Sequence, residues 1–125
     1  MKFLDISGSS EFFGSLEDGA RPLAMRYFNV DACRCPRCLQ PFTARVRRNF
    51  LAGHRVKCTP CGWKGNWRHG TPLDNSGLSA AKFLYLADYL TLGVPVPTIA
   101  QRLGLDPGTV RTWRARLELL LQVAA

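Results

Sequence analysis

Four of the five cysteines lie in two closely spaced pairs, Cys35-Pro-Arg-Cys38 and Cys58-Thr-Pro-Cys61. Nineteen residues separate the pairs, within the spacing of about 15–20 residues that is typical of a structural zinc site. Two residues between paired cysteines let one tight turn present both thiolates to an ion at about 2.3 Å. We therefore predict one structural Zn²⁺ bound by all four. Four thiolates fill the coordination shell and leave no position for a reactive water, which argues against a catalytic zinc.

The remaining cysteine, Cys33, is an alternative ligand. Pairing it with Cys38 would leave four intervening residues and a looser turn, whereas Pro36 suits a turn that begins at Cys35, so we favour Cys35. Nothing at the N-terminus has the form of a secretory signal, and we expect a reducing cytoplasm in which clustered cysteines bind metal rather than form disulfides. His54 is expected to be an exposed imidazole rather than a ligand.

Basic residues concentrate around the cysteines. The formal net charge is +8, and residues 33–70 contain nine Lys and Arg residues and no acidic residue. Such a segment favours a polyanionic partner, nucleic acid before an anionic membrane, although charge runs also occur as solvated surface. No apolar run approaches the ~20 residues that span a membrane. We predict that a basic hairpin between the cysteine pairs contacts DNA through Arg45, Arg47, Arg48, Arg55 and Lys57.

The segment "VPTIAQRLGLDPGTVRTWRARL", residues 96–117, carries a second pattern. Its fifth residue is small, its ninth is glycine, and its tenth, fifteenth and eighteenth are apolar; they are Ala100, Gly104, Leu105, Val110 and Trp113. This spacing is similar to the helix-turn-helix of bacterial DNA-binding proteins. A small side chain lets two helices cross closely, Gly104 suits the end of the first helix, and Asp106 suits the cap of the second. A plain three-helix bundle without a DNA role is the alternative interpretation.

The second helix of this pattern is predicted to enter a DNA groove. Arg111 and Thr112 are the residues chosen for base contacts, because arginine pairs with a guanine edge through two hydrogen bonds. Phosphate contacts are expected from Arg114, Arg116 and Arg102. Thr109 also lies on the outward side of the predicted helix.

These patterns predict a small α+β protein. Residues 1–32 form an acidic lead of unclear structure, with a short strand expected over residues 23–30. Residues 33–70 form a three-stranded zinc ribbon, with a hairpin over residues 42–58 and a third strand at 63–67; the two tryptophans there, Trp63 and Trp67, belong to its core or stack on bases. Residues 71–125 form a three-helix helix-turn-helix bundle, with a support helix over residues 78–92.

The order of a zinc ribbon, a Gly-Thr-Pro link, an aromatic helix and an "IA..LG....TV..W" helix pair resembles the N-terminal DNA-binding region of certain insertion-sequence transposases. The resemblance covers roughly residues 33–120. It implies DNA binding, but that family continues into an acidic, metal-dependent nuclease domain, whereas this sequence ends at Ala125. The acids of residues 71–125, Asp74, Asp88, Asp106 and Glu118, offer no two-metal cluster, so we expect no enzymatic activity.

Taken together, the sequence predicts a sequence-specific double-stranded DNA-binding protein, a transcription regulator of phage or mobile-element type in the cytoplasm. The alternatives are an adaptor that docks on a polymerase or nuclease, and an accessory, non-catalytic transposase subunit. We expect no membrane association and no small-molecule substrate. An apolar stripe in the last helix is interpreted as partly core and leaves a homodimer open; it consists of Leu117, Leu120, Leu121 and Ala124.

Overall fold

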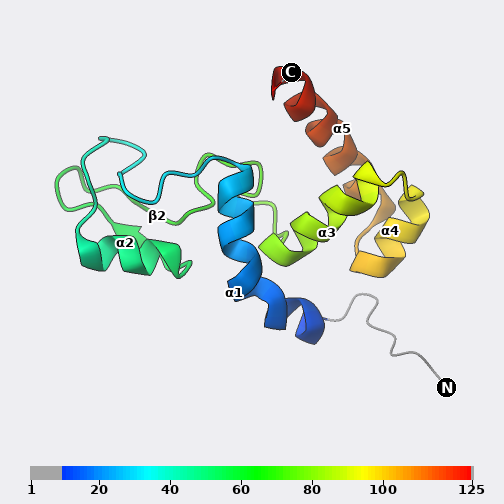
Figure 1. The fold of residues 1–125 in the computed structure, drawn as a ribbon, viewed down its shortest axis with the longest axis horizontal. Helices are drawn as coiled ribbons and strands as arrows, with labels where there is room; N and C mark the ends of the chain where they lie inside the picture. The colour runs from blue at the N-terminus through cyan, green and yellow to red at the C-terminus, as the bar shows by residue number, and fades with distance from the viewer. Residues whose placement is uncertain (1–9, 125) are drawn as a thin grey trace. The chain divides into compact units, whose positions relative to one another are not determined.

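The computed structural model describes residues 10–124 as a small α+β protein with five helices and one two-stranded antiparallel sheet (Figure 1). The elements, in chain order, are α1 (Ser10–Tyr27), α2 (Ala44–Leu51), β1 (Val56–Lys57), β2 (Lys64–Gly65), α3 (Ala80–Thr91), α4 (Val96–Leu103) and α5 (Pro107–Ala124). The chain divides into two compact units. We call Glu17–Ala80 the cysteine unit, and residues 81–124 with residues 10–16 the helical unit.

Helix α1 occupies most of the acidic lead, whose structure the sequence left unclear, and the strand expected over residues 23–30 is wrong. The residues that suggested a strand are aromatic or β-branched, but Ala20, Ala24 and Met25 are buried along one side of a continuous helix. Pro22 lies inside this helix, where it cannot donate a backbone hydrogen bond. The part of the acidic lead at residues 1–9 lies outside the described residues.

Helix α2 replaces the strand expected over residues 42–53. Thr43 caps it by accepting a hydrogen bond from the Val46 amide at 3.3 Å. Val46 and Phe50 stand one helical turn apart, and Phe50 is 2 % exposed, with its ring centroid 5.4 Å from that of Phe42. An eight-residue helix is marginal by itself, so the packing of Phe50 and of α2 on β1 stabilises it.

Four helices end in the same backbone arrangement. Each is followed by a residue with positive φ, namely Asn29, Gly53, Gly93 and Gly104. In each case this residue and the next donate backbone hydrogen bonds to carbonyls in the last turn; after α4, for example, Leu105 donates to Ala100 at 2.9 Å. This is the Schellman motif, in which glycine or asparagine takes the left-handed conformation at little cost. The stop signals of these helices are therefore local.

The sheet of the cysteine unit is short. Strand β1 pairs with β2 in antiparallel register, with Val56 opposite Gly65 and Lys57 opposite Lys64. Three strands were expected, but residues 10–124 contain these two, together with an isolated bridge between Arg34 and Pro41. The buried side chains of the unit are small in number for its length: Ala20, Ala24, Met25, Cys35, Phe50, Val56, Cys58, Trp63, Trp67, Leu73, Leu78 and Ala80.

The helical unit has a continuous apolar core made by α3, α4 and α5. Its fully buried side chains lie at helical spacing: Phe83, Leu86, Ile99, Leu103 and Val110. The Phe83 ring meets that of Trp113 edge-on at 5.8 Å, which joins α3 to α5. Tyr85 of α3 also packs within this unit, because its ring centroid lies 5.6 Å from that of Phe13.

The turn between α4 and α5 has the local features that the sequence predicted. Gly104 has φ 65° and ψ 36° and ends α4 in the left-handed conformation. Asp106 then caps α5, since its Oδ2 accepts the Gly108 amide at 2.8 Å, and Pro107 is the first helical residue. Ala100, 4 % exposed, is a small residue on the face of α4 that packs against α5.

Candidate metal centre and basic surfaces

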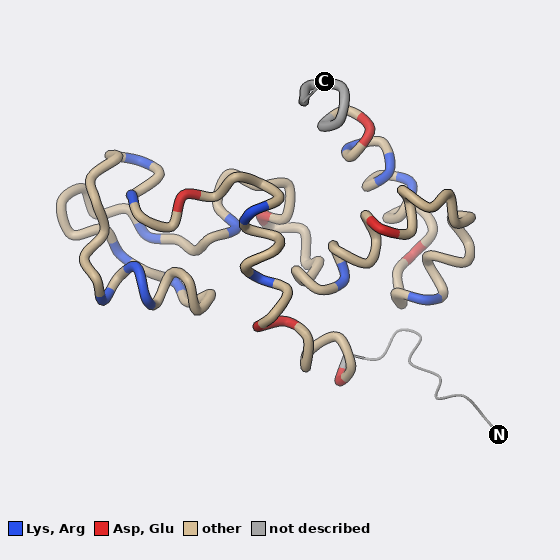
Figure 2. The backbone as a smooth tube through the Cα atoms, viewed as in Figure 1, with Lys and Arg blue, Asp and Glu red and all other residues tan. Residues whose placement is uncertain are grey.

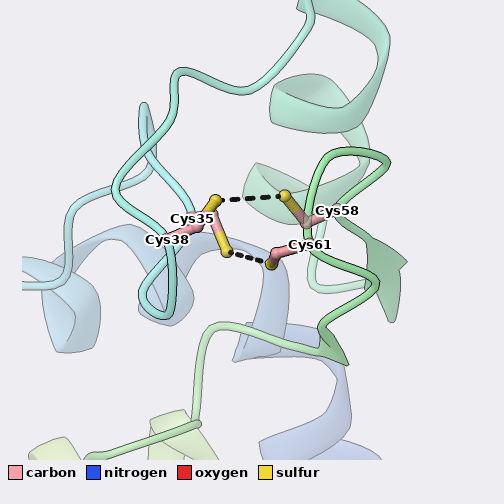
Figure 3. A group of neighbouring side chains, drawn as sticks. All are labelled: Cys35, Cys38, Cys58 and Cys61. Atoms are coloured by element: carbon pink, nitrogen blue, oxygen red, sulfur yellow. Dashed lines mark hydrogen bonds between the residues drawn. The ribbon is translucent and has the colours of Figure 1, made fainter.

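The structure brings Cys35, Cys38, Cys58 and Cys61 together into one cluster (Figure 3). All four Sγ atoms lie within 4.8 Å of one another. The Sγ atoms of Cys35 and Cys61 are 3.6 Å apart, and those of Cys38 and Cys58 are also 3.6 Å apart. A disulfide bond needs a sulfur–sulfur distance of about 2.05 Å, so the four are thiols positioned around a common centre.

Each cysteine pair sits in a turn with the same hydrogen-bond pattern. In the first turn, Leu39 donates to the Cys35 carbonyl at 2.9 Å, and the Cys35 amide donates to the Gln40 carbonyl at 3.0 Å. In the second, Gly62 donates to the Cys58 carbonyl and the Cys58 amide donates to Trp63, both at 2.7 Å. Two equivalent turns thus face each other and supply two sulfurs each.

One position differs between the two turns. The residue after the second cysteine has positive φ in both, 63° at Leu39 and 78° at Gly62. Glycine adopts this conformation freely, whereas a leucine there stores about 1–2 kcal/mol of strain. A glycine such as Gly62 is a recognisable sequence signal for this conformation, whereas nothing in the Leu39 side chain signals a left-handed backbone.

The cluster fits a tetrahedral metal ion. Four sulfurs at about 2.3 Å from a tetrahedral centre stand about 3.8 Å apart, close to the two observed separations of 3.6 Å. Cys35 and Cys58 are buried, at 0 % and 3 % exposed, and their partners Cys38 and Cys61 are partly exposed. Four cysteines in this arrangement can bind one structural metal ion.

The surroundings set the pKa values of two thiols in opposite directions. Burial raises the pKa of Cys35, but hydrogen bonds from the backbone of Cys38 and Arg37 and from the second cysteine pair outweigh it and hold the pKa at about 7. For Cys58, the Cys61 backbone lowers the pKa, but burial and the side-chain hydrogen bonds prevail and raise it to about 12. A metal ion bound by the four cysteines would displace their thiol protons, since metal-bound cysteines are thiolates.

Cys33 lies outside the cluster, as expected. Its side chain is exposed, its amide donates to Asp31 Oδ1 at 2.8 Å, and its carbonyl accepts from Phe42 at 2.8 Å. Cys33 is therefore a backbone element of the first turn rather than a sulfur donor. Of the other residues interpreted from sequence, His54 is exposed, as predicted.

The two tryptophans of the cysteine unit belong to its core. Trp63 is 7 % and Trp67 is 4 % exposed, so neither offers a face for stacking on bases. The Trp63 ring contacts His69 at 5.3 Å, and the Arg68 guanidinium lies over the Trp67 ring at 5.6 Å. The core interpretation is confirmed by this burial.

Three of the predicted basic contacts are on a helix instead of a hairpin strand. Arg45, Arg47 and Arg48 are exposed on α2 (Figure 2). In a strand, Arg45 and Arg47 would share a face, but at about 100° per residue they point about 200° apart. Arg45 and Arg48 share a face instead. Arg55 precedes β1 and Lys57 lies within it, and both are exposed.

The residues chosen for DNA contact in the helical unit are all exposed. Thr109, Arg111, Thr112, Arg114 and Arg116 lie on α5, and Arg102 lies in the last turn of α4. Two of them have intramolecular partners: the Thr112 hydroxyl donates to the Gly108 carbonyl at 2.9 Å, and the Arg116 guanidinium lies 5.1 Å from the Trp113 ring.

The stripe at the end of α5 is described only in part. Leu117 is 6 % exposed and belongs to the core. The side chains of Leu120, Leu121 and Ala124 lie outside the described residues.

No protein-family model matches the chain, and comparisons with curated proteins and with solved structures give no significant match. Across residues 10–124, no helix has the length and apolar character needed to cross a membrane.

Proposed function

We propose that this protein is a zinc-containing, sequence-specific double-stranded DNA-binding protein without enzymatic activity. The observation that carries the proposal is a cluster of four cysteines, able to hold one metal ion, within a strongly basic segment. Residues 33–70 comprise both cysteine turns, α2 and the two-stranded sheet. They include nine Lys and Arg residues and no acidic residue. Zinc with four thiolates has a formal charge of −2, so the surface remains strongly basic when the metal is bound.

Zinc is the ion proposed for the site. A buried, four-cysteine donor set favours zinc because thiolates bind it strongly and a tetrahedral shell satisfies it. The ion would fix the two cysteine turns and, through them, the orientation of α2. It would have a structural role only, because four thiolates leave no open coordination position.

The proposal interprets α4 and α5 as a DNA-binding helix-turn-helix. Support comes from the left-handed Gly104, the Asp106 cap and the buried Ile99, Val110 and Trp113. In this interpretation α5 enters the major groove and Arg111 reads a guanine edge, while basic residues elsewhere contact phosphates. Because the Thr112 hydroxyl already donates to the helix backbone, it is left as an acceptor for a base amino group.

The order of these parts along the chain resembles the DNA-binding region of insertion-sequence transposases, and the proposal extends to that type of role. The protein would bind the ends or the control region of a mobile element, as a regulator or as a non-catalytic partner of a transposase. The resemblance rests on the residues quoted above, and the comparisons add no relative to it.

Selection of bound duplexes from a random pool, with zinc measured on the same sample, tests the proposal. We expect one zinc per chain, an enriched sequence and an affinity that falls steeply with salt. Failure to bind any duplex at low salt would contradict DNA binding and favour a protein-binding adaptor.

Three variants then separate the contacts. Arg111→Ala should cost about 1–3 kcal/mol on the selected site and relax its sequence preference. Arg47→Ala should weaken binding to all duplexes alike and reduce the salt dependence. Arg26→Ala is the matched control, because Arg26 is an exposed arginine of α1 that is not among the predicted DNA contacts. If Arg111→Ala and Arg47→Ala act equally on all duplexes, the assignment of base reading to α5 is wrong.

A further inference from the structure

The cysteine unit contains a cavity of about 240 Å³ beside the first cysteine turn. Its floor is apolar and buried, formed by Cys35, Phe50 and Trp67, which are 0 %, 2 % and 4 % exposed. Its rim is polar and carries the side chains of Asp31, Arg34, Asn66 and His69. An apolar floor with a few polar groups around the mouth is the usual construction of a ligand site.

The rim groups retain hydrogen-bonding capacity. One carboxylate oxygen of Asp31 accepts the Cys33 amide at 2.8 Å, which leaves the other oxygen available. Asn66 Oδ1 accepts the Arg68 amide at 3.0 Å, which leaves the Asn66 NH₂ group available. Within residues 10–124, the Arg34 guanidinium has no hydrogen bond or ion pair. The rim thus offers both donors and an acceptor to a bound molecule.

The walls of this cavity are held in place. The backbone of Arg34 is fixed by its bridge to Pro41, next to a cysteine of the cluster. The Trp67 ring is held as well, because the Arg68 guanidinium covers one of its faces and also donates to the Leu78 carbonyl. A cavity whose backbone and aromatic wall are preorganised in this way loses less entropy on binding.

The size and chemistry of the cavity select its occupant. Sites for drug-sized molecules measure about 300–1,000 Å³, so a cavity of about 240 Å³ suits a smaller planar group. Among the groups that a strongly basic unit would meet on a nucleic acid, an unstacked base is flat, apolar on its faces and polar at its edge. Proteins that bind extruded bases use such pockets, with apolar walls and hydrogen bonds to the base edge.

We propose that this cavity binds an unpaired nucleobase, with guanine preferred. Guanine presents acceptors at O6 and N7, which suit the Arg34 guanidinium, and amino and imino donors, which suit the free oxygen of Asp31. Thymine has a single imino donor, no amino group and no N7 acceptor, so it offers one donor fewer to Asp31 and cannot accept two hydrogen bonds from Arg34 as guanine O6 and N7 do. The inference rests on the proposed function in taking nucleic acid as the partner, and it adds recognition of a single-stranded or extruded nucleotide next to the duplex.

The test uses the full, zinc-loaded chain and the selected duplex with a short single-stranded extension. In one series of extensions, a guanine is placed at each position in turn. In the matched series, an abasic site replaces that guanine. We expect guanine at one position to tighten binding at least fivefold over the abasic site, and thymine to give less than half of that gain. Equal binding of the guanine and abasic extensions would overturn the cavity proposal and leave duplex binding intact. A cavity built for an apolar side chain of a partner protein would give that result.

Two arginines of the same turn provide the matched variants. Arg34 lines the cavity, whereas Arg37 is equally exposed in the same turn but does not. Arg34→Gln should abolish the preference for guanine, and Arg37→Gln should retain it, although both lose one charge and bind more weakly overall. Equal loss of the preference in both variants would contradict the proposal. Zinc content, measured on each variant, confirms that the cysteine turn is intact.

Free nucleotide separates this inference from the proposed function. Guanosine 5′-monophosphate, titrated into the labelled protein, should shift the NMR signals of Asn66 and His69 in the wild type and not in Arg34→Gln. If no duplex binds but this shift is seen, the proposed duplex function fails and the cavity proposal stands. If guanosine monophosphate and thymidine monophosphate both leave these signals unchanged, the cavity proposal fails whatever the duplex result.

Discussion

Replacing Cys58 with serine should unfold the cysteine unit and leave the helical unit folded. Cys58 is 3 % exposed and its Sγ stands 3.6 Å from that of Cys38. Serine retains the size and the backbone hydrogen bonds of the turn but supplies a hydroxyl, which is not among the usual zinc ligands. The change therefore removes metal affinity while preserving local geometry.

The expected magnitude follows from the small core. Besides alanines and cysteines, the cysteine unit buries seven apolar side chains: Met25, Phe50, Val56, Trp63, Trp67, Leu73 and Leu78. A structural zinc contributes about 10–16 kcal/mol at pH 7, as much as the entire net stability of a typical domain, about 5–15 kcal/mol. The burial of seven apolar side chains cannot compensate for the loss of most of this free energy, so the unit should be unfolded at 25 °C.

The three tryptophans report on the folding of the two units separately. Trp63 and Trp67 lie in the cysteine unit, whereas Trp113 lies in the helical unit against Phe83. In a ¹H–¹⁵N spectrum, the indole signals of Trp63 and Trp67 should collapse toward random-coil positions in Cys58→Ser. The Trp113 signal should stay in place. Chelation of the metal from the wild-type protein should give the same pattern.

Cys33→Ser is the control, because Cys33 is exposed and lies outside the cluster. It should keep one zinc per chain and all three native indole signals. If Cys58→Ser retains the native signals of Trp63 and Trp67, the unit does not depend on the metal and the reasoning is refuted. Loss of the Trp113 signal as well would show that the two units do not fold independently.

Three further changes test local packing, each by chemical denaturation of the metal-loaded protein. Gly65→Ala should destabilise by about 1–3 kcal/mol, because a Cβ there would stand 2.5 Å from Trp63 Cζ2; an unchanged midpoint would show that the ring moves aside freely. Gly19→Ala in α1 should stabilise by about 0.5–1 kcal/mol, since the added Cβ meets nothing within 4 Å, and a loss would contradict this. Asp106→Ala should cost about 0.5–2 kcal/mol by removing the cap on Gly108, whereas Asp106→Asn should cost little; equal costs would argue against capping.

The features that the sequence predicted correctly depend on short stretches of chain. The spacing of Cys35, Cys38, Cys58 and Cys61 was sufficient to identify the cluster, because a two-residue gap forces both sulfurs of a pair to one side of a turn. Gly104 and the Asp106 cap were also predictable, since helix ends are set by the backbone preferences of neighbouring residues. Each cysteine turn and each helix end is encoded within about six residues, although the cluster itself needs both turns.

The wrong predictions concern segments whose structure depends on packing against other parts of the chain. Residues 42–53 alternate apolar and basic side chains well enough to suggest a strand, and they also place Val46 and Phe50 at helical spacing. The choice between these periods is made by what Phe50 packs against, namely Phe42 and strand β1. In a strand Arg45 would share a face with Arg47, whereas in helix α2 it shares a face with Arg48.

Two further features were decided only by the tertiary structure. The left-handed conformation of Leu39 follows from closing a cysteine turn equivalent to the one at Gly62, and a leucine gives no local signal for it. The cavity beside Cys35 combines residues from the end of α1, the first cysteine turn, α2 and the segment after β2. The sequence by itself therefore determined the cysteine cluster and the helix ends, because each cysteine turn and each helix end is encoded locally, whereas packing between elements determined which surface the arginines form and where a cavity opens.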